Sequence, residues 1–486
     1  MAKHFGIDFG TTNSAVVIYD DQRRRFTRIG EKGPIPFPSV IAVDNLTQEV
    51  SAGLEVKDQI IAMREGGMHL VIESVKTLLD TDQLWTTPGR TWRAGDIASE
   101  LFRALARRAE EDEHQPLREA VVAIPVGMNA EKRATLRNAA HAAGLEVLSF
   151  ISEPTAAFIA HSGQLRHCRF AVVFDWGGGT LDISVLEVRG GCIIEKFTAG
   201  SPKAGDHIDD LVARWLHTQI SEAHGLTISF DSVAPAERHI LLNESEKAKR
   251  FLQQEDATQA VIELGRYAGL TLVAQTLTKA TLNSLLTEVV SGALDLLLQG
   301  VESARVSQEE IGKLIVVGGT SQLSLLQREL RERWPHPNII FPREADWDIA
   351  RGAAWVAANP GCYRMAESVG VILSDDEFHN IFPVNTKQES ARSTLHFGLV
   401  EDATTATFNF AAHNGDERAL HIGELYTSCF GFRDELIELD CYITSDLVFE
   451  ANANSQAKPH GKQSFKYDML RWMYEVPESD ISQEDL

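Results

Sequence analysis

Two short stretches decide the fold of this chain: Asp8-Phe9-Gly10-Thr11-Thr12-Asn13 and Asp175-Trp176-Gly177-Gly178-Gly179-Thr180. Each lies between two apolar runs, an order that predicts strand, tight turn and strand. Glycines let a backbone approach a ligand and present N–H groups to an anion. Threonine hydroxyls add donors, and the aspartates can face a divalent cation. Two such turns in two halves of one chain indicate a triphosphate held between two lobes, although either turn alone would equally fit an ordinary hairpin.

Composition sets broad limits on function. The 486 residues carry a formal net charge of −23, which argues against nucleic acid as the main partner. Five cysteines without a CxxC pair favour reduced thiols and a cytoplasmic location. We expect no signal peptide, and no membrane span, because Glu288 and Asp295 interrupt the apolar stretch 285–301.

Strands and helices alternate through the first 358 residues. Residues 120–125 and 147–151 read as buried strands, and Asn129 and Ser152 are placed to cap the helices that follow them. This pattern predicts an α/β fold with mixed, largely parallel sheets and ligands at the strand ends. Further predictions are a mainly helical region over 209–298 with a short strand stretch near 260–273, a strand over 313–317, and helices over 323–333 and 348–355.

The hydrophobic period changes from about 3.6 to 2 after the break Asn359-Pro360-Gly361. Alternating runs such as Leu395/Phe397/Leu399 predict an antiparallel β-sandwich. We therefore divide the chain into a two-lobed α/β domain (1–358), a short linker (359–367), a β-sandwich (368–475) and an acidic tail (476–486) that we expect to be disordered.

Five motifs in order resemble the Hsp70 chaperones, within the wider actin/hexokinase/Hsp70 ATPase superfamily. The two turns resemble that family's phosphate loops. The family's two connecting helices resemble Ser152-Glu153-Pro154-Thr155-Ala156-Ala157 and Gly352-Ala353-Ala354. Its adenosine turn resembles Gly318-Gly319-Thr320-Ser321. The resemblance implies a two-lobed actin-like ATPase domain with duplicated mixed sheets, followed by a peptide-binding sandwich.

The resemblance also implies catalytic roles. Asp8, Glu153 and Asp175 would hold Mg²⁺, largely through waters, because Mg²⁺ dehydrates reluctantly. Lys76 would face the γ-phosphate and the attacking water, and Asp182, alone or with Asp8, would orient that water. Catalysis would then consist of positioning and electrostatic stabilisation.

Residues that would hold ATP or ADP follow from the same motifs. Glu246 and Lys249 would bind the ribose and Arg250 would stack on adenine, although their helical spacing also fits a solvated charged face. The complete predicted set is Gly10, Thr11, Thr12, Asn13, Gly177, Gly178, Gly179, Thr180, Gly205, Glu246, Lys249, Arg250, Gly318, Gly319, Thr320 and Asp346.

Two further groups depend on the resemblance. Pro125 and Arg133 match positions that relay nucleotide state between domains; otherwise Pro125 ends a strand and Arg133 is a surface charge. Phe378, Phe397, Ala406 and Phe408 fall where the family binds extended peptide, although Phe397 and Phe408, each taken alone, fit ordinary core packing better. Expected partners are an unfolded or dedicated client polypeptide, a J-domain co-chaperone and a nucleotide-exchange factor, with no nucleic acid and no membrane.

Several departures from the family pattern leave alternatives open. The sequence ends soon after the predicted sandwich, so we expect no long helical lid, and the acidic leucine-rich linker is replaced by the short 360–367 segment. The 76–96 stretch is short, Ala204 replaces one glycine of a Gly-Gly pair, and Gln322 replaces an arginine. We therefore weigh two hypotheses: an Hsp70-like ATPase that binds clients, and a non-catalytic, ATP-gated module that docks one partner. A small-molecule kinase of the same superfamily lacks support, since we find no base aspartate with a sugar pocket.

Overall fold

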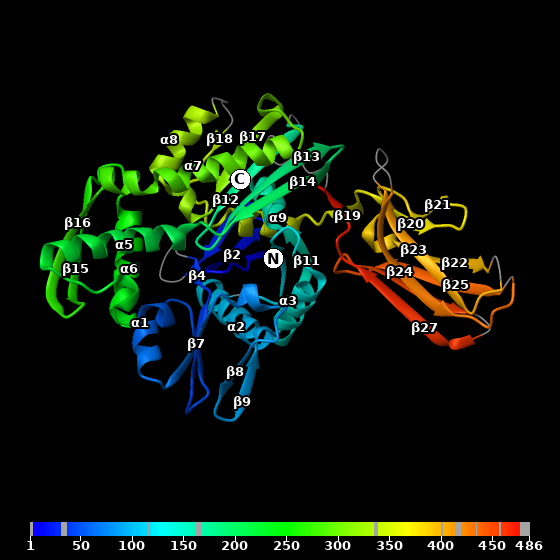
Figure 1. The fold of residues 1–486 in the computed structure, drawn as a ribbon, viewed down its shortest axis with the longest axis horizontal. Helices are drawn as coiled ribbons and strands as arrows, with labels where there is room; N and C mark the ends of the chain where they lie inside the picture. Colours follow the sequence, from blue (N-terminus) through cyan, green and yellow to red (C-terminus); the bar gives the residue numbers. More distant parts are fainter. Residues whose placement is uncertain are drawn as a thin grey trace.

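The computed structural model describes residues 3–30, 36–114, 116–161, 168–334, 339–399, 402–413, 419–433, 435–455 and 458–476. Figure 1 shows two α/β lobes on one side of the molecule and a strand-rich region on the other. The described residues end at Val476, so the predicted acidic tail beyond it lies outside them.

The first lobe is built on a sheet whose strands follow the order β11-β10-β1-β2-β3. Strands β1 and β2 are antiparallel, whereas β1, β10 and β11 run parallel to one another. Their bounds are β1 Lys3–Asp8, β2 Asn13–Asp20, β3 Arg25–Ile29, β10 Glu119–Ile124 and β11 Glu146–Ser152, and the short β4 (Phe37–Pro38) pairs with β2.

The second lobe repeats this arrangement. Its sheet contains the order β18-β17-β12-β13-β14, in which β12 to β14 are antiparallel and β12, β17 and β18 are parallel. The bounds are β12 Phe170–Trp176, β13 Leu181–Arg189, β14 Cys192–Ser201, β17 Ile311–Val317 and β18 Ile339–Ile340. The duplicated mixed sheets confirm the fold class expected from the two glycine-threonine turns.

Helices α4 (Glu153–Ala160) and α9 (Asp348–Ala358) pack against each other and join the two lobes. Small residues make this packing close: a Cβ on Gly352 would lie 1.9 Å from the Ala156 carbonyl oxygen, and one on Gly6 would lie 2.1 Å from the Ala354 nitrogen. The predicted capping also holds, because the side chains of Asn129 and Ser152 accept hydrogen bonds from Lys132 N and Thr155 N.

Other helices complete the two lobes. The predicted strand stretch near residues 260–273 is a longer hairpin, β15 (Gln259–Tyr267) and β16 (Leu270–Thr278). The helices are α1 Leu54–Glu65, α2 Ala94–Glu113, α3 Ala130–Ala142, α5 Gly205–His224, α6 Pro235–Phe251, α7 Lys279–Ser303 and α8 Ser324–Arg333. The other strands of the lobes are β5 Val40–Asp44, β6 Val50–Ala52, β7 His69–Glu73, β8 Leu84–Thr87 and β9 Arg90–Arg93. The lobes also contain the 3₁₀ turns η1 Val75–Leu78, η3 Phe230–Ser232, η4 Gln308–Glu310 and η5 Gly319–Gln322. A further 3₁₀ turn, η6 Gln388–Ser390, lies in the strand-rich region.

Among the described helices, α7 is long and apolar enough, by length and composition alone, to cross a membrane. Its buried side chains, which include Leu286, Val290 and Leu294, belong to the core of the second lobe, where α7 contacts β13 and β14. This packing accounts for its apolar character.

The strand-rich region is a sandwich of two four-stranded sheets, with orders β21-β20-β23-β24 and β22-β25-β26-β27. Its core contains the fully buried Phe410 and Phe449, whose ring centroids lie 5.3 Å apart. The strands are β20 Ser368–Ile372, β21 Phe378–Phe382, β22 Arg392–Gly398, β23 Thr405–His413, β24 Leu420–Ser428, β25 Leu436–Ile443, β26 Phe449–Ser455 and β27 Lys458–Tyr467.

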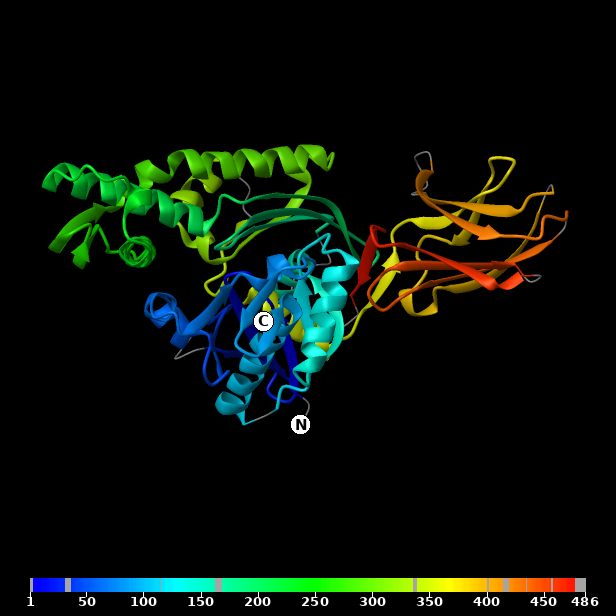
Figure 2. The ribbon, with the colours of Figure 1, turned by 60° about the horizontal axis from the view of Figure 1, so that its bottom comes forward.

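Two strands that flank the sandwich in sequence join the sheet of the second lobe. The order β14-β28-β19 places β28 (Trp472–Glu475) between the lobe and β19 (Cys362–Met365), with both contacts antiparallel. Figure 2 shows β28, in red, at the junction of the two regions. The expected boundary at residue 475 assigned these last residues to the sandwich, whereas their hydrogen bonds place them in the lobe's sheet.

Candidate active site

The two glycine-threonine turns occupy equivalent places, between the first and second strands of each sheet. They also face each other: a Cβ on Gly178 would lie 3.0 Å from Thr12 Oγ1, and one on Gly179 would lie 3.8 Å from Thr11 Cγ2. Gly10 has no room for a side chain, because a Cβ there would lie 1.8 Å from the Asn13 carbonyl oxygen. The turns therefore face each other across the boundary between the two lobes, here called the cleft, as their residue types predict.

A buried lysine lies close to the acidic side chains of this region. Lys76, on η1, is 9% exposed in its side chain, and its Nζ is 2.6 Å from Glu153 Oε1 at the start of α4. Burial alone would lower the lysine pKa, but the charges of Glu153 and Asp8 outweigh it and raise that pKa. Lys76 is therefore a fixed positive charge in a buried setting.

Three aspartates surround Lys76 and Glu153. Burial, followed by the charge of Glu153, raises the pKa of Asp8 to about 7. The same two causes raise the pKa of Asp175 well above its ordinary value, and burial raises that of Asp182, which lies opposite Asp175 across β12 and β13. The cluster holds more negative charge than Lys76 neutralises, which is the electrostatic setting of a cation site.

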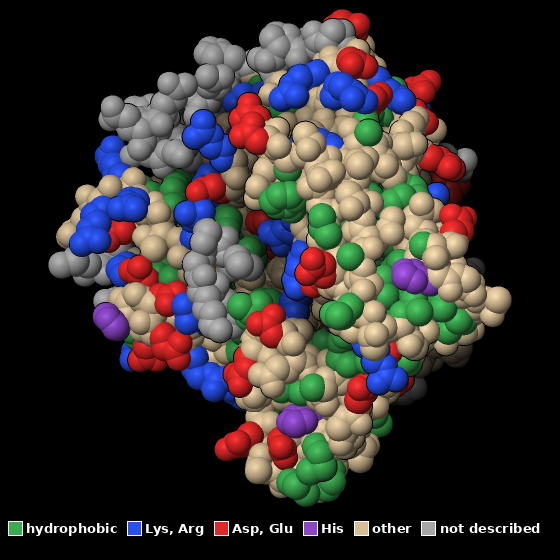
Figure 3. Space-filling model, turned by 90° about the vertical axis from the view of Figure 1, so that its left-hand side faces the viewer, with side chains coloured by type: hydrophobic (Ala, Val, Ile, Leu, Met, Phe, Trp, Pro, Cys, Tyr) green, Lys and Arg blue, Asp and Glu red, His purple; other side chains and the backbone are tan. Residues whose placement is uncertain are grey.

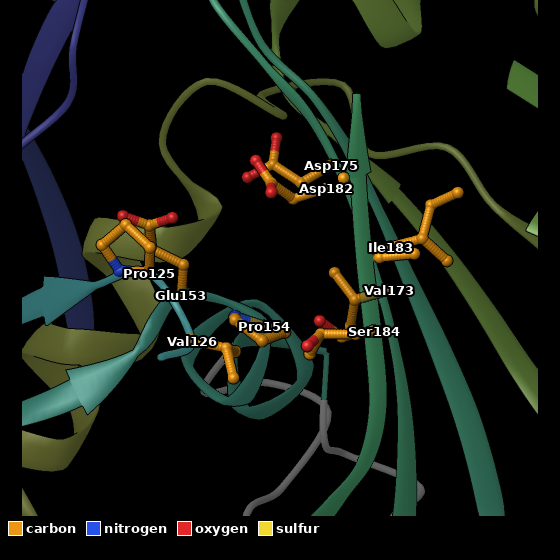
Figure 4. A pocket seen from close by; sticks show the side chains of 12 residues that line it. Pro125, Val126, Glu153, Pro154, Val173, Asp175, Asp182, Ile183 and Ser184 are labelled. Carbon is orange, nitrogen blue, oxygen red and sulfur yellow. The ribbon is translucent and has the colours of Figure 1, made fainter. Parts of the chain in front are cut away.

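A cavity of about 240 Å³ lies beneath these carboxylates, between the two lobes. Figure 4 shows Asp175 and Asp182 on one side of it, and Glu153 and Pro125 on the other. Within the described ranges, no three His, Cys, Asp or Glu side chains are close enough to hold a metal ion directly. The carboxylates instead fit a Mg²⁺ ion that keeps most of its water ligands.

The predicted adenosine turn closes another side of the cleft. Gly318 has φ +83°, and a Cβ there would lie 2.6 Å from Asp175 Oδ1. Thr320 Oγ1 donates to the Gly177 carbonyl at 2.7 Å, and Gly205 packs against both Thr320 and Gly178. The structure thus brings the second phosphate turn, Gly205 and the adenosine turn together.

A comparison with known protein families matches residues 68–375 to the Hsp70 protein family. The match covers more than half of the 486 residues. The chain belongs to the Hsp70 family. Proteins of this family are chaperones and ATPases that bind ATP or ADP with Mg²⁺ and interact with client polypeptides and co-chaperones.

The three charged residues predicted to hold the nucleoside in this Hsp70 protein differ in their settings. Lys249 is buried, and its Nζ lies 2.8 Å from Asp209 Oδ1, so the ammonium already has a partner. Glu246 pairs with Lys57 of α1 at 3.6 Å, and Arg250 is 62% exposed and lies 3.5 Å from Glu246. The helical spacing predicted their shared face, but it gave no sign that Asp209 on α5 neutralises Lys249.

Asp346 and Asp206 complete the surroundings of the nucleotide cleft. A Cβ on Gly319 would lie 3.0 Å from Asp346 Oδ1, which places this aspartate beside the adenosine turn. Asp206 Oδ1 would lie 3.3 Å from a Cβ on Gly178, and burial raises the pKa of its carboxyl. Sequence reasoning missed Asp206, although its position directly after Gly205 was a usable signal.

The predicted peptide-binding residues separate into two pairs. Ala406 and Phe408 are buried in the sandwich core, so the core interpretation is right for Phe408. Phe378 and Phe397 are half-buried, and the Phe397 ring lies 5.3 Å from Phe408. In this structure only the second pair, among these four, has a surface that a peptide could reach.

Of the two predicted relay residues, Pro125 precedes α3 and Arg133 lies within its first turns. Pro125 lines the cavity beneath the carboxylates. Arg133 is 7% exposed, so the interpretation of it as a surface charge is wrong. Its guanidinium donates to the Met128 carbonyl, and burial lowers its pKa while Asp468 near the sandwich opposes that effect. Arg133 therefore sits where α3 meets the sandwich.

Direct contacts join α3 to the sandwich region. Asp468 accepts a hydrogen bond from Ala130 N at 2.7 Å, at the start of α3, where a carboxylate is favourable. Arg137 Nη2 lies 2.8 Å from Asp446.

On the opposite end of the molecule, Figure 3 shows acidic and basic side chains interspersed, with basic ones along the central furrow.

Proposed function

We propose that this chain binds Mg²⁺-ATP between its two lobes, hydrolyses it slowly, and binds polypeptide through its sandwich. The observation that carries the proposal is the convergence of both phosphate turns on a buried lysine and four carboxylates. Thr11 and Thr12 from one lobe face Gly178 and Gly179 from the other. An arrangement of this kind suits phosphoryl transfer, in which the protein mainly positions charges.

Each group has a distinct part in this proposal. Backbone N–H groups and the hydroxyls of Thr11, Thr12 and Thr180 would hold the β- and γ-phosphates. Lys76, kept charged by Glu153 and Asp8, would stabilise the charge that develops on the transferred phosphoryl group. Asp182, on the side of the cavity facing Glu153, would accept the proton of the attacking water.

The carboxylate cluster fits Mg²⁺ by charge and by donor type. Asp8, Asp175 and Glu153 would hold it through water ligands, since oxygen donors are the ligands that Mg²⁺ prefers. Bound there, the ion would neutralise phosphate charge. It would also offset the burial and the charge of Glu153, which together raise the pKa of Asp8 and of Asp175.

The client and the cellular setting complete the proposal. Phe378 and Phe397 offer partly exposed apolar surface on the sandwich for an extended, apolar polypeptide. A J-domain co-chaperone and a nucleotide-exchange factor would regulate the cycle. The free thiols of Cys168, Cys192, Cys362, Cys429 and Cys441 favour a cytoplasmic location.

The second candidate function is a non-catalytic module that binds ATP and docks one dedicated partner. The strand pairing of β28 with both β14 and β19 favours it, because this pairing ties the sandwich to the ATPase domain at two points. A fixed arrangement of domains suits docking better than a cycle of client capture and release. The intact Lys76–Glu153 pair favours the enzyme instead.

Single-turnover hydrolysis of Mg²⁺-ATP separates the two candidates. We would compare the wild type with Lys76→Ala, each with and without an unfolded apolar peptide. Lys3→Ala is the matched control, because Lys3 also pairs with a glutamate, Glu113 at 2.9 Å, but lies outside the cleft. Hydrolysis that depends on Lys76 and responds to peptide supports the chaperone; tight ATP binding without Lys76-dependent turnover supports the docking module.

A further inference from the structure

Glu195 lies on the cleft-facing side of the second lobe's sheet. Along β13, Asp182, Ser184 and Leu186 follow one another on one face. A register shift between Val185 and Leu186 makes their partners on β14 Gly200, Thr198 and Glu195. Glu195 thus shares a face with Asp182, on the strand that also supplies Thr198 and Gly200 to the cavity.

The carboxylate of Glu195 accepts hydrogen bonds from two hydroxyls at the start of α4. Ser152 Oγ donates to Glu195 Oε1, and Thr155 Oγ1 donates to the same oxygen at 3.1 Å. Ser152 is the residue that caps α4, and its hydroxyl also accepts from Thr155 N at 3.3 Å. One carboxylate oxygen from β14 therefore holds both side chains that define the first turn of this helix.

One of the two residues between these contacts is Glu153, the partner of Lys76. Glu153 is the first residue of α4, directly after Ser152. Its side chain is held at 2.6 Å from Lys76 Nζ, and its direction depends on the direction of the first helical turn. Since α4 continues from β11 of the first lobe and Glu195 belongs to the second, these hydrogen bonds cross from one lobe to the other.

A half-buried carboxylate is an expensive way to hold a helix. Burial raises the pKa of Glu195, and the Ser152 and Thr155 hydroxyls oppose that shift. An apolar side chain at the same place would avoid the desolvation penalty. It would also leave both hydroxyls without this acceptor. Glu195 therefore lowers the stability of the fold but gives α4 a contact with a fixed direction.

We propose that Glu195 is a positioning residue for Glu153: its hydrogen bonds to Ser152 and Thr155 fix the first turn of α4 against the second lobe, and thereby set the place of Glu153 beside Lys76. The inference rests on the proposed ATPase function for its consequence in turnover. Its structural part, the bracing of α4 by Glu195, stands apart from that function.

A second contact supports the same corner of the structure. Tyr363 on β19 donates from its hydroxyl to the Phe150 carbonyl at 3.1 Å, two residues before Ser152. The corner between β11 and α4 is thus held from β14 and from β19. Both strands belong to the same sheet, in which β28 lies between them.

Hydrogen–deuterium exchange of the full chain tests the bracing without any reference to hydrolysis. Glu195→Ala should speed exchange in peptides that cover residues 152–158, and Glu195→Gln should restore most of the protection because its amide oxygen still accepts a hydrogen bond. Glu187→Ala is the matched control: this buried glutamate lies on β13 and faces Arg169 and Lys196 instead of α4. Unchanged exchange at residues 152–158 in Glu195→Ala would overturn the proposal.

Single-turnover kinetics then test whether the bracing acts through Glu153. A displaced catalytic group costs rate steeply, so Glu195→Ala should slow hydrolysis about 10-fold, with Glu195→Gln much closer to wild type. In a Glu153→Gln background, Glu195→Ala should cause no further loss. Losses that multiply in the double variant would overturn the positioning role. A wild type that hydrolyses no ATP would instead contradict the proposed function, and exchange alone would then decide the role of Glu195.

Discussion

Arg364 Nε in β19 donates to Glu475 Oε2 in β28 at 2.7 Å, which links the two segments that flank the sandwich in sequence. The thiol of Cys362 donates to the same oxygen at 2.8 Å, and Gly361 N donates to the Tyr474 hydroxyl at 2.9 Å. Arg364 is 17% exposed in its side chain, so this ion pair is partly shielded from water. The entry to the sandwich and the exit from it are therefore held together on the edge of the second lobe.

The first prediction concerns this double connection. A chain that ends at Arg471 lacks β28, so β14 keeps β13 on one side but loses its neighbour on the other, and β19 loses the strand that joins it to the sheet. The sandwich should then move independently, because relative motion is the default for domains joined by a small interface. Small-angle X-ray scattering should show a larger radius of gyration than for a control chain that ends at Val476. Identical scattering would show that the contacts of α3 with Asp446 and Asp468 suffice to hold the domains.

The second prediction compares two glycines in helices. Gly352→Ala in α9 should destabilise the protein by several kcal/mol, since its Cβ would overlap the Ala156 carbonyl oxygen of α4, and overpacking alone costs about 1–3 kcal/mol. Gly292→Ala in α7 should stabilise it by about 0.5–1 kcal/mol, because nothing lies within 4 Å of that Cβ and alanine favours helix. Chemical unfolding of both variants gives the two signs. A neutral Gly352→Ala would mean that α4 and α9 can separate without cost.

Local sequence patterns predicted the turns and the helix starts well. Asp8 to Asn13, Asp175 to Thr180, and the caps Asn129 and Ser152 each depend on neighbours within a few residues, so their residue types determine their structure. The resemblance assigned Lys76 and Glu153, 77 residues apart in sequence, to one active site, and the structure brings them into contact, which the separate roles expected for them did not predict.

Long-range contacts could not be predicted in the same way. Nothing about Trp472–Glu475 indicates that it pairs with β14, because an edge strand's partner is set by the whole fold. Asp209 and Glu195 are ordinary polar residues in their own segments, and only the folded chain brings them to Lys249 and Ser152. The charged face of α6 was ambiguous for this reason.

The third prediction concerns the pH dependence of stability without nucleotide. Burial and the charge of Glu153 raise the pKa of Asp8 from 3.8 to about 7, so the folded protein binds this proton more tightly than the unfolded chain does. The corresponding stability is present below about pH 4 and is lost as pH rises to about 7. Asp8→Asn removes this loss, so its melting temperature should exceed that of the wild type by more at pH 8 than at pH 5.

The control for this pH series is Asp20→Asn. Asp20 is partly exposed, and hydrogen bonds from the Arg23 and Gln22 backbone lower its pKa, so its replacement should give no such gain at pH 8. Differential scanning calorimetry at both pH values measures the comparison. A gain for Asp8→Asn that is equal at the two pH values would show that Asp8 does not titrate in this range.

The fourth prediction separates the sandwich core from its reachable surface. Phe408 is 6% exposed within the core, so Phe408→Ala should destabilise the sandwich by about 3–5 kcal/mol. Phe397 is half-buried on β22 and contacts Phe408 at its ring edge, so Phe397→Ala should cost less stability. If the sandwich binds apolar polypeptide, Phe397→Ala should also weaken the binding of a fluorescent apolar peptide, measured by anisotropy at a temperature where both variants remain folded. A Phe397→Ala variant that binds as tightly as the wild type would remove β22 from the client-binding surface, and would leave Phe378 on β21 as the position to test.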